Sequence, residues 1–361
     1  MSLVHISYKK VSSVQTLIVG GGLSGLAISE VLETQGHDYM LVEARNRFGG
    51  RIKTEYHGLG YFDMGPAWFW PEQPRILSLI DRFGLKKFDQ FSKGSLIFED
   101  STGQVERERE RGISSMEGAW RLKGGLAELT KTLSDLVPKT KKRLNAKVTA
   151  LVRTDKGITV SLGNGEEIVA EQVILALPPR VATQINFLPT LPLMASHSMN
   201  NVATWMAGQA KALAVYDKPF WREAGLSGNA MSRFGPMVEI HDASPETGGP
   251  YALFGFVGVP PQGRSDKQLL EHNVLSQLSR LFGTEAKDPL KIYIKDWAFD
   301  SYTSTDADKK PLYSHPKYGM PPEIIGLWDK KLYFTGTEVA TQFGGYIEGA
   351  LEAAESTLDK L

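Results

Sequence analysis

Residues 16–43 constrain the fold of this chain more than any other stretch. An apolar run at 17–19 leads into the glycine pattern GxGxxG at 20–25, and apolar residues then recur at helical spacing. A second apolar run, at 39–42, ends in an acid, Glu43. The order of strand, glycine turn, helix, strand and acid predicts a βαβ unit of the type that binds dinucleotides.

There is a physical reason why each position in this pattern needs its residue type. Gly20 permits the tight turn out of the strand, Gly22 lets a pyrophosphate approach the backbone, and Gly25 lets the helix pack closely on the sheet. The helix N-terminus offers N–H groups and the positive end of its dipole to the phosphates. Glu43 is placed to accept hydrogen bonds from a ribose diol, so a dinucleotide cofactor is the first functional expectation.

The composition is that of a globular chain. Its 361 residues suggest roughly two domains, and 42% are hydrophobic and 23% charged. The 41 basic and 41 acidic residues cancel, so we expect no nucleic-acid or membrane partner. The chain has no cysteine, which excludes disulfides and thiolate chemistry, and we assign no metal ligand. Residues 1–13 lack the apolar core of a signal peptide, so we expect a cytoplasmic protein.

An uncharged stretch at 181–210 needs a separate interpretation. Its prolines at 189 and 192, with several Asn residues and a His, make it too polar and too broken for a membrane-spanning helix. Composition leaves two interpretations open, the wall of an internal cavity and ordinary buried core.

Further periodic runs predict helices, a small antiparallel meander and a last strand. The helices are expected at 76–83, after the Gly124-Gly125 turn, at 268–282 and from about 345, the meander at 147–179, and the strand at 331–334. Alternating charges at 106–111 predict a solvated strand or turn without a function.

Five separated pieces of the chain carry a resemblance to a known family. They are the extension VEARNRFGGRI of the βαβ unit, FDMGPAWF at 62–69, the Gly124-Gly125 turn, KALAVYDKPFWREAGLSG at 211–228 and YFTGTEVATQFGGYIEGALEAAES at 333–356. In this order they resemble the flavin-containing amine oxidases, the family of monoamine and polyamine oxidases and their bacterial relatives. The pieces run nearly from one end of the chain to the other.

The resemblance implies an α/β fold with a Rossmann-like FAD-binding domain of the glutathione-reductase and amine-oxidase type. A smaller α+β substrate domain would be built on a mixed β-sheet. The implied FAD-binding segments are 14–80, 120–187 and 296–361, and the substrate domain is 188–295 with a reduced insertion at 81–119. Only about forty residues separate Gly84 from Gly124, where larger members carry a longer helical insertion.

The resemblance also implies which residues hold FAD. Arg45 and Arg51 would lie near the pyrophosphate, because guanidinium groups match phosphate oxygens. The main chain of Val148 would meet the adenine. The complete implied set is Gly20, Gly22, Gly25, Glu43, Ala44, Arg45, Gly50, Arg51, Gly65, Ala67, Trp68, Val148, Gly336, Thr337, Glu338, Gly345 and Tyr346. The chain lacks cysteine and has no histidine near Tyr302, so we expect FAD to be bound non-covalently.

Two residues are implied to be catalytic, Lys211 and Tyr346. In the family the lysine binds a water at flavin N5 and helps the reduced flavin to react with oxygen. The tyrosine of the GYxEG motif forms one wall of an aromatic cage that positions the amine.

The second wall of the cage is where this chain departs from the family pattern. Counting from the W-x4-Y motif puts Asp306 and Ala307 at the positions concerned. Either another aromatic residue supplies the second wall, with Trp205, Tyr313 and Tyr318 as candidates, or the cage is incomplete.

The function implied is oxidation of an amine to an imine, with hydride transfer to flavin N5 and reoxidation by O2 to H2O2. The partners are then a small amine and O2, and the protein is a monomer or a homodimer. Two alternatives stay open: an FAD enzyme acting on carbon–carbon bonds, such as a porphyrinogen oxidase or a desaturase, and a non-catalytic FAD-binding protein.

Overall fold

The computed structural model describes residues 11–108, 116–310, 312 and 314–361. The chain forms two compact units. The first unit is made of Met1–Gly50, Thr130–Thr204 and Pro316–Leu361, and the second of Arg51–Leu129 and Trp205–His315. Each unit therefore draws on distant parts of the sequence. The predicted run of alternating charges is described only as far as Glu108, the end of β7, and its remainder lies outside the described residues.

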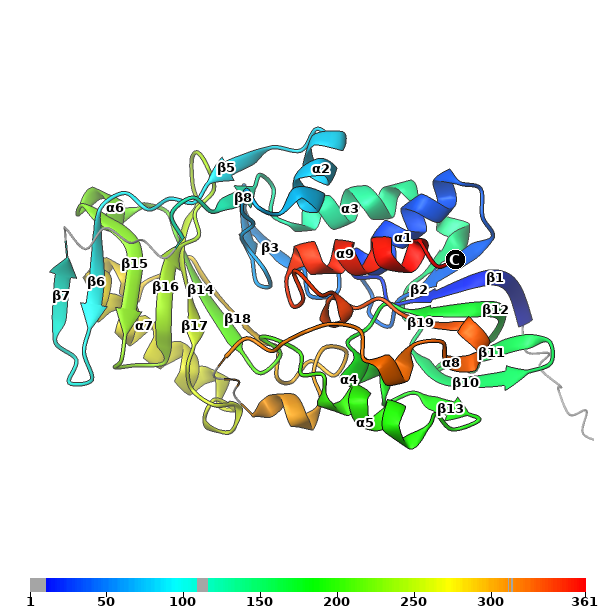
Figure 1. The fold of residues 1–361 in the computed structure, drawn as a ribbon. Helices are drawn as coiled ribbons and strands as arrows, with labels where there is room; N and C mark the ends of the chain where they lie inside the picture. Colours follow the sequence, from blue (N-terminus) through cyan, green and yellow to red (C-terminus); the bar gives the residue numbers. More distant parts are fainter. Residues whose placement is uncertain (1–10, 109–115, 311, 313) are drawn as a thin grey trace, which may run out of the picture. The chain divides into compact units, whose positions relative to one another are not determined.

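The first unit is built on a mixed sheet with the strand order β13-β10-β11-β12-β1-β2-β9, in which β19 also pairs with β12 (Figure 1). Strands β1, β2, β12 and β19 are mutually parallel, as a dinucleotide-binding fold requires. The strands are β1 (Val11–Val19), β2 (Tyr39–Val42), β9 (Lys142–Arg143), β10 (Val148–Thr154), β11 (Gly157–Leu162), β12 (Glu167–Leu175), β13 (Asn186–Leu188) and β19 (Leu332–Phe334).

The helices of this unit follow from the patterns in the sequence. Helix α1 (Leu23–Thr34) connects β1 to the parallel strand β2, which confirms the predicted βαβ unit. The C-terminal helix α9 (Ile347–Leu358) packs beside α1 (Figure 1). The meander is also confirmed, except that its last two runs form one strand, β12. Short helices α4 (Pro179–Ala182), α5 (Leu193–Asn201) and α8 (Leu327–Lys330) complete the set.

The uncharged stretch forms α4, β13, α5 and the start of the next strand. In α5, Ala195 and Met199 are buried in the core of the unit, whereas Leu193 is 85% exposed. The helix thus covers the core with one face and presents the other to solvent. Neither expectation for this stretch, cavity wall or plain core, describes it fully.

The second unit is built on a seven-stranded sheet with the order β18-β14-β17-β16-β15-β6-β7 (Figure 1). Successive residues of β14 point to opposite faces. Ala210, Ala212 and Ala214 join the core beneath helix α7 (Lys267–Phe282), whereas Leu213 and Val215 join a second cluster. The strands are β6 (Ser95–Glu99), β7 (Val105–Glu108), β14 (Ala210–Tyr216), β15 (Leu226–Ser232), β16 (Met237–Asp242), β17 (Tyr251–Val257) and β18 (Lys291–Asp296).

The long helix of this unit, α7 (Lys267–Phe282), begins where Asp266 accepts a hydrogen bond from the Leu269 amide. Helix α2 begins with a proline, which suits a first helical position. Smaller elements are β3 (Thr54–His57), β4 (Gly60–Asp63), α2 (Pro74–Arg82), β5 (Lys87–Asp89), β8 (Trp120–Leu122) and α6 (Phe220–Glu223), with α3 (Ala127–Leu136) leading back into the first unit. The 3-10 turns of the chain are η1 (Lys139–Lys141), η2 (Pro261–Gly263), η3 (Thr284–Lys287), η4 (Asp306–Lys309), η5 (Pro322–Ile324) and η6 (Thr337–Val339).

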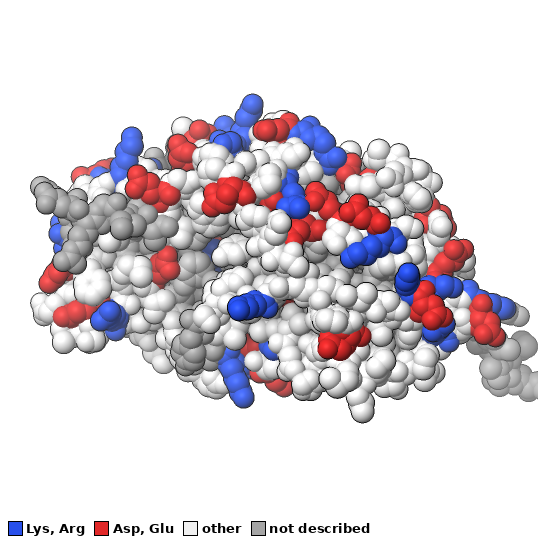
Figure 2. All heavy atoms as spheres, viewed as in Figure 1, with Lys and Arg blue, Asp and Glu red and all other residues white. Residues whose placement is uncertain are grey.

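Charges of both signs are interspersed on the face of the molecule drawn in Figure 2. This distribution matches the net charge of zero. The described part of that face therefore offers no broad field of one sign to steer a charged partner.

Candidate functional site

The glycine turn after β1 is shaped by close contacts within the first unit. Gly20 has a φ of +111°, and a Cβ there would lie 2.5 Å from the carbonyl oxygen of Ala176. A Cβ on Gly25 would lie 2.0 Å from the oxygen of Gly20, so both positions require glycine. At Gly22 the nearest atom to such a Cβ is 4.0 Å away, on Gly50. The backbone at Gly22 is thus open to a close ligand.

The N-terminus of α1 is available for an anion. Its N-cap residue is Gly22, which has no side chain with which to bond the first N–H groups of the helix. The loop that follows β2 lies beside this glycine turn. The Gly49 amide donates to the Gly21 oxygen at 2.8 Å, and Gly22 and Gly49 form an isolated β-bridge. Gly50, with a φ of +57°, is next in this loop. Two glycine-rich segments therefore converge at the helix dipole, as a pyrophosphate site requires.

Glu43 lies at the end of β2 and is buried. Its Oε2 accepts from the Gly21 amide at 2.8 Å and its Oε1 from the Arg45 amide at 2.8 Å. The carboxylate therefore fixes the glycine turn to the loop containing Ala44 and Arg45. A carboxylate has about four acceptor positions, so these two bonds are compatible with accepting a ribose hydroxyl as well.

The C-terminal strand–turn–helix brings several predicted residues together. The Thr337 hydroxyl donates to the main-chain oxygen of Tyr346 at 2.7 Å. The Gly345 amide donates to the Thr337 hydroxyl at 3.0 Å. Gly336 precedes this threonine, and Glu338, which follows it, is fully buried. Val148 stands apart from this group, at the start of β10 in the same unit.

Glu352 on α9 holds the loop before this turn, a role that the sequence did not reveal. From α9 its carboxylate accepts the amides of Thr341, Gln342 and Phe343 at 2.8–3.3 Å. Burial raises the pKa of Glu352, but these hydrogen bonds outweigh burial and hold it below its ordinary value. An acid on the polar positions of a helix carries no sequence signal of such a role.

The aromatic residues considered for the substrate cage lie in different parts of the chain. Tyr346 is 42% exposed, and Tyr318 packs so closely on Gly344 that a Cβ there would lie 2.3 Å from the Tyr318 Cβ. Trp205 belongs to the second unit, where its ring contacts His315 at 5.1 Å, and Tyr313 lies outside the described residues. The Asp306 side chain is 96% exposed and pairs with a lysine of the same 3-10 turn.

Lys211 is a buried cation of the second unit. It is 3% exposed, and its Nζ donates to the Gly65 oxygen at 2.7 Å and to the Asp63 oxygen at 3.2 Å. The rings of Phe254, Phe256 and Trp68 surround it at 4.3, 5.4 and 5.9 Å. Burial lowers the pKa of Lys211 from 10.5 to about 7, against the attraction of Asp63.

The loop that faces Lys211 is held by contacts the sequence did not reveal. A Cβ on Gly65 would lie 1.9 Å from the main-chain oxygen of Arg51. The loop therefore packs directly against the backbone of Arg51, and only glycine fits at residue 65. Ala67 and Trp68 are buried, and Trp68 Nε1 donates to Gln90 Oε1 at 2.8 Å. Gln90 in turn donates to the main-chain oxygen of residue 242 at 2.8 Å. Gln90 therefore fixes the orientation of the tryptophan.

The PFWR signature has a structural role in this unit. Trp221 donates to Asp242 at 2.8 Å, and Arg222 makes a two-point ion pair with the same carboxylate at 2.7 and 2.8 Å. Asp242 is fully buried, and both partners come from the short helix α6. The signature therefore anchors α6 to the end of β16.

Comparisons with known proteins identify the family of this chain. The sequence profile described as flavin containing amine oxidoreductase matches residues 23–115 and 108–357. The chain belongs to this family of flavin-containing amine oxidases. It is accordingly an enzyme, and its cofactor is FAD. The absence of cysteine excludes a thioether link to the flavin.

Individual relatives match the chain over nearly its whole length. The flavin-containing amine oxidase B of Sus scrofa is 23% identical, with 95% of this chain and 85% of the relative covered. That alignment spans 455 positions against 361 residues here, so the relative carries segments that this chain lacks.

Solved structures show the same fold. A putrescine oxidase bound to putrescine superposes with a TM-score of 0.80 at 20% identity, covering 97% of this chain and 99% of that one. The cyclohexylamine oxidase of Brevibacterium oxydans gives 0.78 at 21% identity, with 96% and 98% covered. These likenesses confirm the predicted α/β fold class. Among the described residues, no helix is long and apolar enough to cross a membrane.

Proposed function

We propose that this enzyme oxidises a small amine to the corresponding imine, and that O2 then takes up the electrons to give H2O2. The observation that carries this proposal is Lys211, a buried lysine held by two carbonyl oxygens and surrounded by three aromatic rings. The solved neighbours named for putrescine and cyclohexylamine make aliphatic amines the first compounds to test.

When bound, FAD would supply the acceptor at flavin N5 for the hydride that leaves the carbon next to the amine nitrogen, and water would hydrolyse the released imine. The residues of the chain would bind FAD and orient the amine. The N–H groups at the start of α1 and the turn at Gly22 would hold the pyrophosphate, with Glu43 on the ribose. The substrate must present a neutral amine to lose hydride, so the rate of flavin reduction should rise with pH.

Lys211 and Tyr346 have different proposed tasks. The ammonium of Lys211 would stabilise the negative charge that develops as oxygen is reduced, without touching the amine. The exposed ring of Tyr346 would position the amine and exclude water from it. We expect Lys211→Met to slow reoxidation far more than reduction, and Tyr346→Ala to do the reverse. Stopped-flow measurement of each half-reaction separates the two, and equal impairment of one half-reaction in both variants would contradict this division.

The activity itself is tested by anaerobic titration of the FAD-loaded protein with a panel of aliphatic, aromatic and diamine substrates. We expect at least one amine to bleach the visible flavin absorbance, and admitted oxygen to restore it. Dithionite in a parallel sample shows that the bound flavin can be reduced. If dithionite bleaches the flavin while every amine leaves it oxidised, the amine-oxidase activity is refuted.

A further inference from the structure

Asp63 is a buried carboxyl to which the proposed function assigns no task. It ends β4 in the second unit and is 4% exposed. Its Oδ1 accepts from Thr54 Oγ1 at 2.6 Å and from the Leu126 amide at 3.0 Å, and its Oδ2 accepts from that amide at 3.2 Å. Both oxygens are thus acceptors, which is the pattern of a carboxylate at the entry of a helix, here α3.

The Gly124-Gly125 turn makes this arrangement possible. Gly125 has a φ of +86°, and a Cβ there would lie 2.5 Å from Thr54 Cγ2 and 3.1 Å from Asp63 Oδ1. A side chain at this position would therefore separate the carboxylate from the amide that it binds. The β3–β4 hairpin and the distant glycine turn thus meet at Asp63.

The main chain of the same residue reaches Lys211. The carbonyls of Asp63 and Gly65 both accept from the lysine Nζ, and the carbonyl of Met64 between them accepts from Trp297 Nε1 at 3.0 Å. Three successive carbonyls are thus engaged by side chains from β14 and from the residue after β18. The position of the ammonium depends on how this loop is held.

Charged groups from several elements act on this ammonium. Asp63 on β4 favours its charged form, and Arg121 on β8 opposes it. Lys295 on β18 is its register partner but is itself paired with Asp300 at 2.7 Å. Arg121 is buried and donates to two main-chain oxygens at 2.6 and 2.9 Å. Burial raises the pKa of Asp63 above its ordinary value, and the Thr54 hydroxyl, Arg121, the Leu126 amide and Lys211 act in the opposite direction to favour its charged form. With burial and a second cation against it, the charge on Lys211 depends on a carboxylate at residue 63.

We propose that Asp63 is a positioning residue for Lys211, one that orients the ammonium through its carbonyl and supplies the buried counter-charge through its carboxylate. The inference rests on the proposed function in one respect, namely that Lys211 promotes reoxidation by O2. We predict that the negative charge of Asp63, and not only the size and shape of its side chain, sets the pH range in which Lys211 acts.

The experiment measures the pH dependence of flavin reoxidation by O2 in the FAD-loaded protein, after photoreduction without any amine. In the wild type the rate should fall as Lys211 loses its proton. Asp63→Asn removes the anion and nearly keeps the side-chain volume, so the midpoint should move to lower pH by about one unit. Asp63→Glu, which restores the charge, should recover much of the wild-type midpoint.

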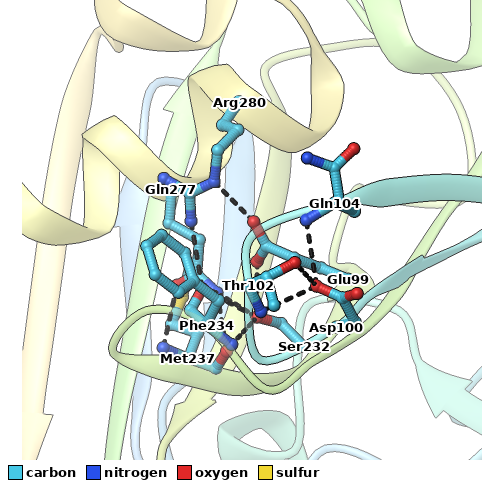
Figure 3. A network of polar contacts seen from close by, with 9 residues as sticks. All are labelled: Glu99, Asp100, Thr102, Gln104, Ser232, Phe234, Met237, Gln277 and Arg280. Atoms are coloured by element: carbon cyan, nitrogen blue, oxygen red, sulfur yellow. Dashed lines mark hydrogen bonds and ion pairs between the residues drawn. The ribbon is translucent and has the colours of Figure 1, made fainter.

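A matched control is available in the sheet that contains Lys211. Glu99 is another fully buried carboxylate, which accepts from Ser232 Oγ at 2.6 Å and pairs with Arg280 beside Gln277 (Figure 3). It lies on β6, four strands along the sheet from β14. Glu99→Gln should weaken folding but leave the reoxidation midpoint unchanged.

The outcomes distinguish this inference from the proposed function. A shift of the reoxidation midpoint in Asp63→Asn but not in Glu99→Gln supports the role of Asp63, whereas equal shifts or no shift in either variant would overturn it.

If Asp63→Asn does not retain FAD, Thr54→Val serves instead. Its midpoint should shift less but in the same direction, and an unmoved midpoint there refutes the inference. A Lys211→Met protein with the wild-type pH profile would refute the role of Lys211 itself. Failure of every amine to reduce the flavin would leave this test intact, because photoreduction needs no substrate.

Discussion

Replacing Lys211 by Met should change how the stability of the protein depends on pH. Lys211 is buried with a pKa of about 7, against 10.5 in its ordinary state. Between these values the unfolded chain binds the lysine proton more strongly than the folded chain does. The free energy of unfolding of the wild type must therefore rise with pH in this window, and a methionine contributes no such slope.

The magnitude follows from the two pKa values. Each pH unit in the window is worth at most about 1.4 kcal/mol, and the slope is half-developed at the folded pKa. From about pH 7 to about pH 9 the wild type should gain roughly 2 kcal/mol of unfolding free energy relative to Lys211→Met. The substitution also leaves the Asp63 and Gly65 carbonyls without this donor, but that cost is common to both pH values and cancels in the comparison.

The assay is urea unfolding of both FAD-loaded proteins at a fixed concentration of free FAD, followed by tryptophan fluorescence. The midpoints of the two proteins should diverge as the pH is raised, with the wild type gaining. Lys295→Met is a suitable control, because that lysine is only partly buried and is paired with Asp300. Parallel midpoints for wild type and Lys211→Met across the window would show that the pKa of Lys211 is not depressed in the folded protein.

Three further predictions concern the cofactor. Glu43→Gln should weaken FAD binding by about 10- to 100-fold, since a charge-assisted hydrogen bond is worth about 1.5–3 kcal/mol, and equilibrium dialysis against FAD would show it. Acid precipitation should leave the flavin colour in the supernatant, and colour in the pellet would contradict non-covalent binding. Glu352→Gln should loosen the loop before Gly345 and weaken FAD retention, whereas Glu355→Gln, on the exposed face of the same helix, should retain FAD normally.

Much of the first unit could be predicted from the sequence because its signals are local. The strand, glycine turn, helix and acid of residues 16–43 are consecutive, and each constrains its neighbours through backbone geometry. The close contacts at Gly20 and Gly25 are the structural reason for that glycine pattern.

The contacts that the sequence did not reveal join residues far apart in the chain. Gln90 orients Trp68, and Asp242 anchors the PFWR signature from a strand that follows it by about twenty residues. Nothing in the spacing of a single sequence indicates such pairs, because tertiary folding alone brings them together. The family resemblance pointed to Lys211, but only the structure shows that two carbonyls of one loop hold it.

In the proposed reaction, FAD bound to this chain transfers electrons from an amine to O2. The most direct test follows oxygen uptake, H2O2 formation and aldehyde release together in one reaction of the FAD-loaded protein with an amine that bleaches its flavin. We expect equal amounts of O2 consumed, H2O2 formed and aldehyde released, with the yield abolished when the flavin is removed. Aldehyde formed without oxygen uptake, or oxygen uptake that does not depend on the amine, would contradict it.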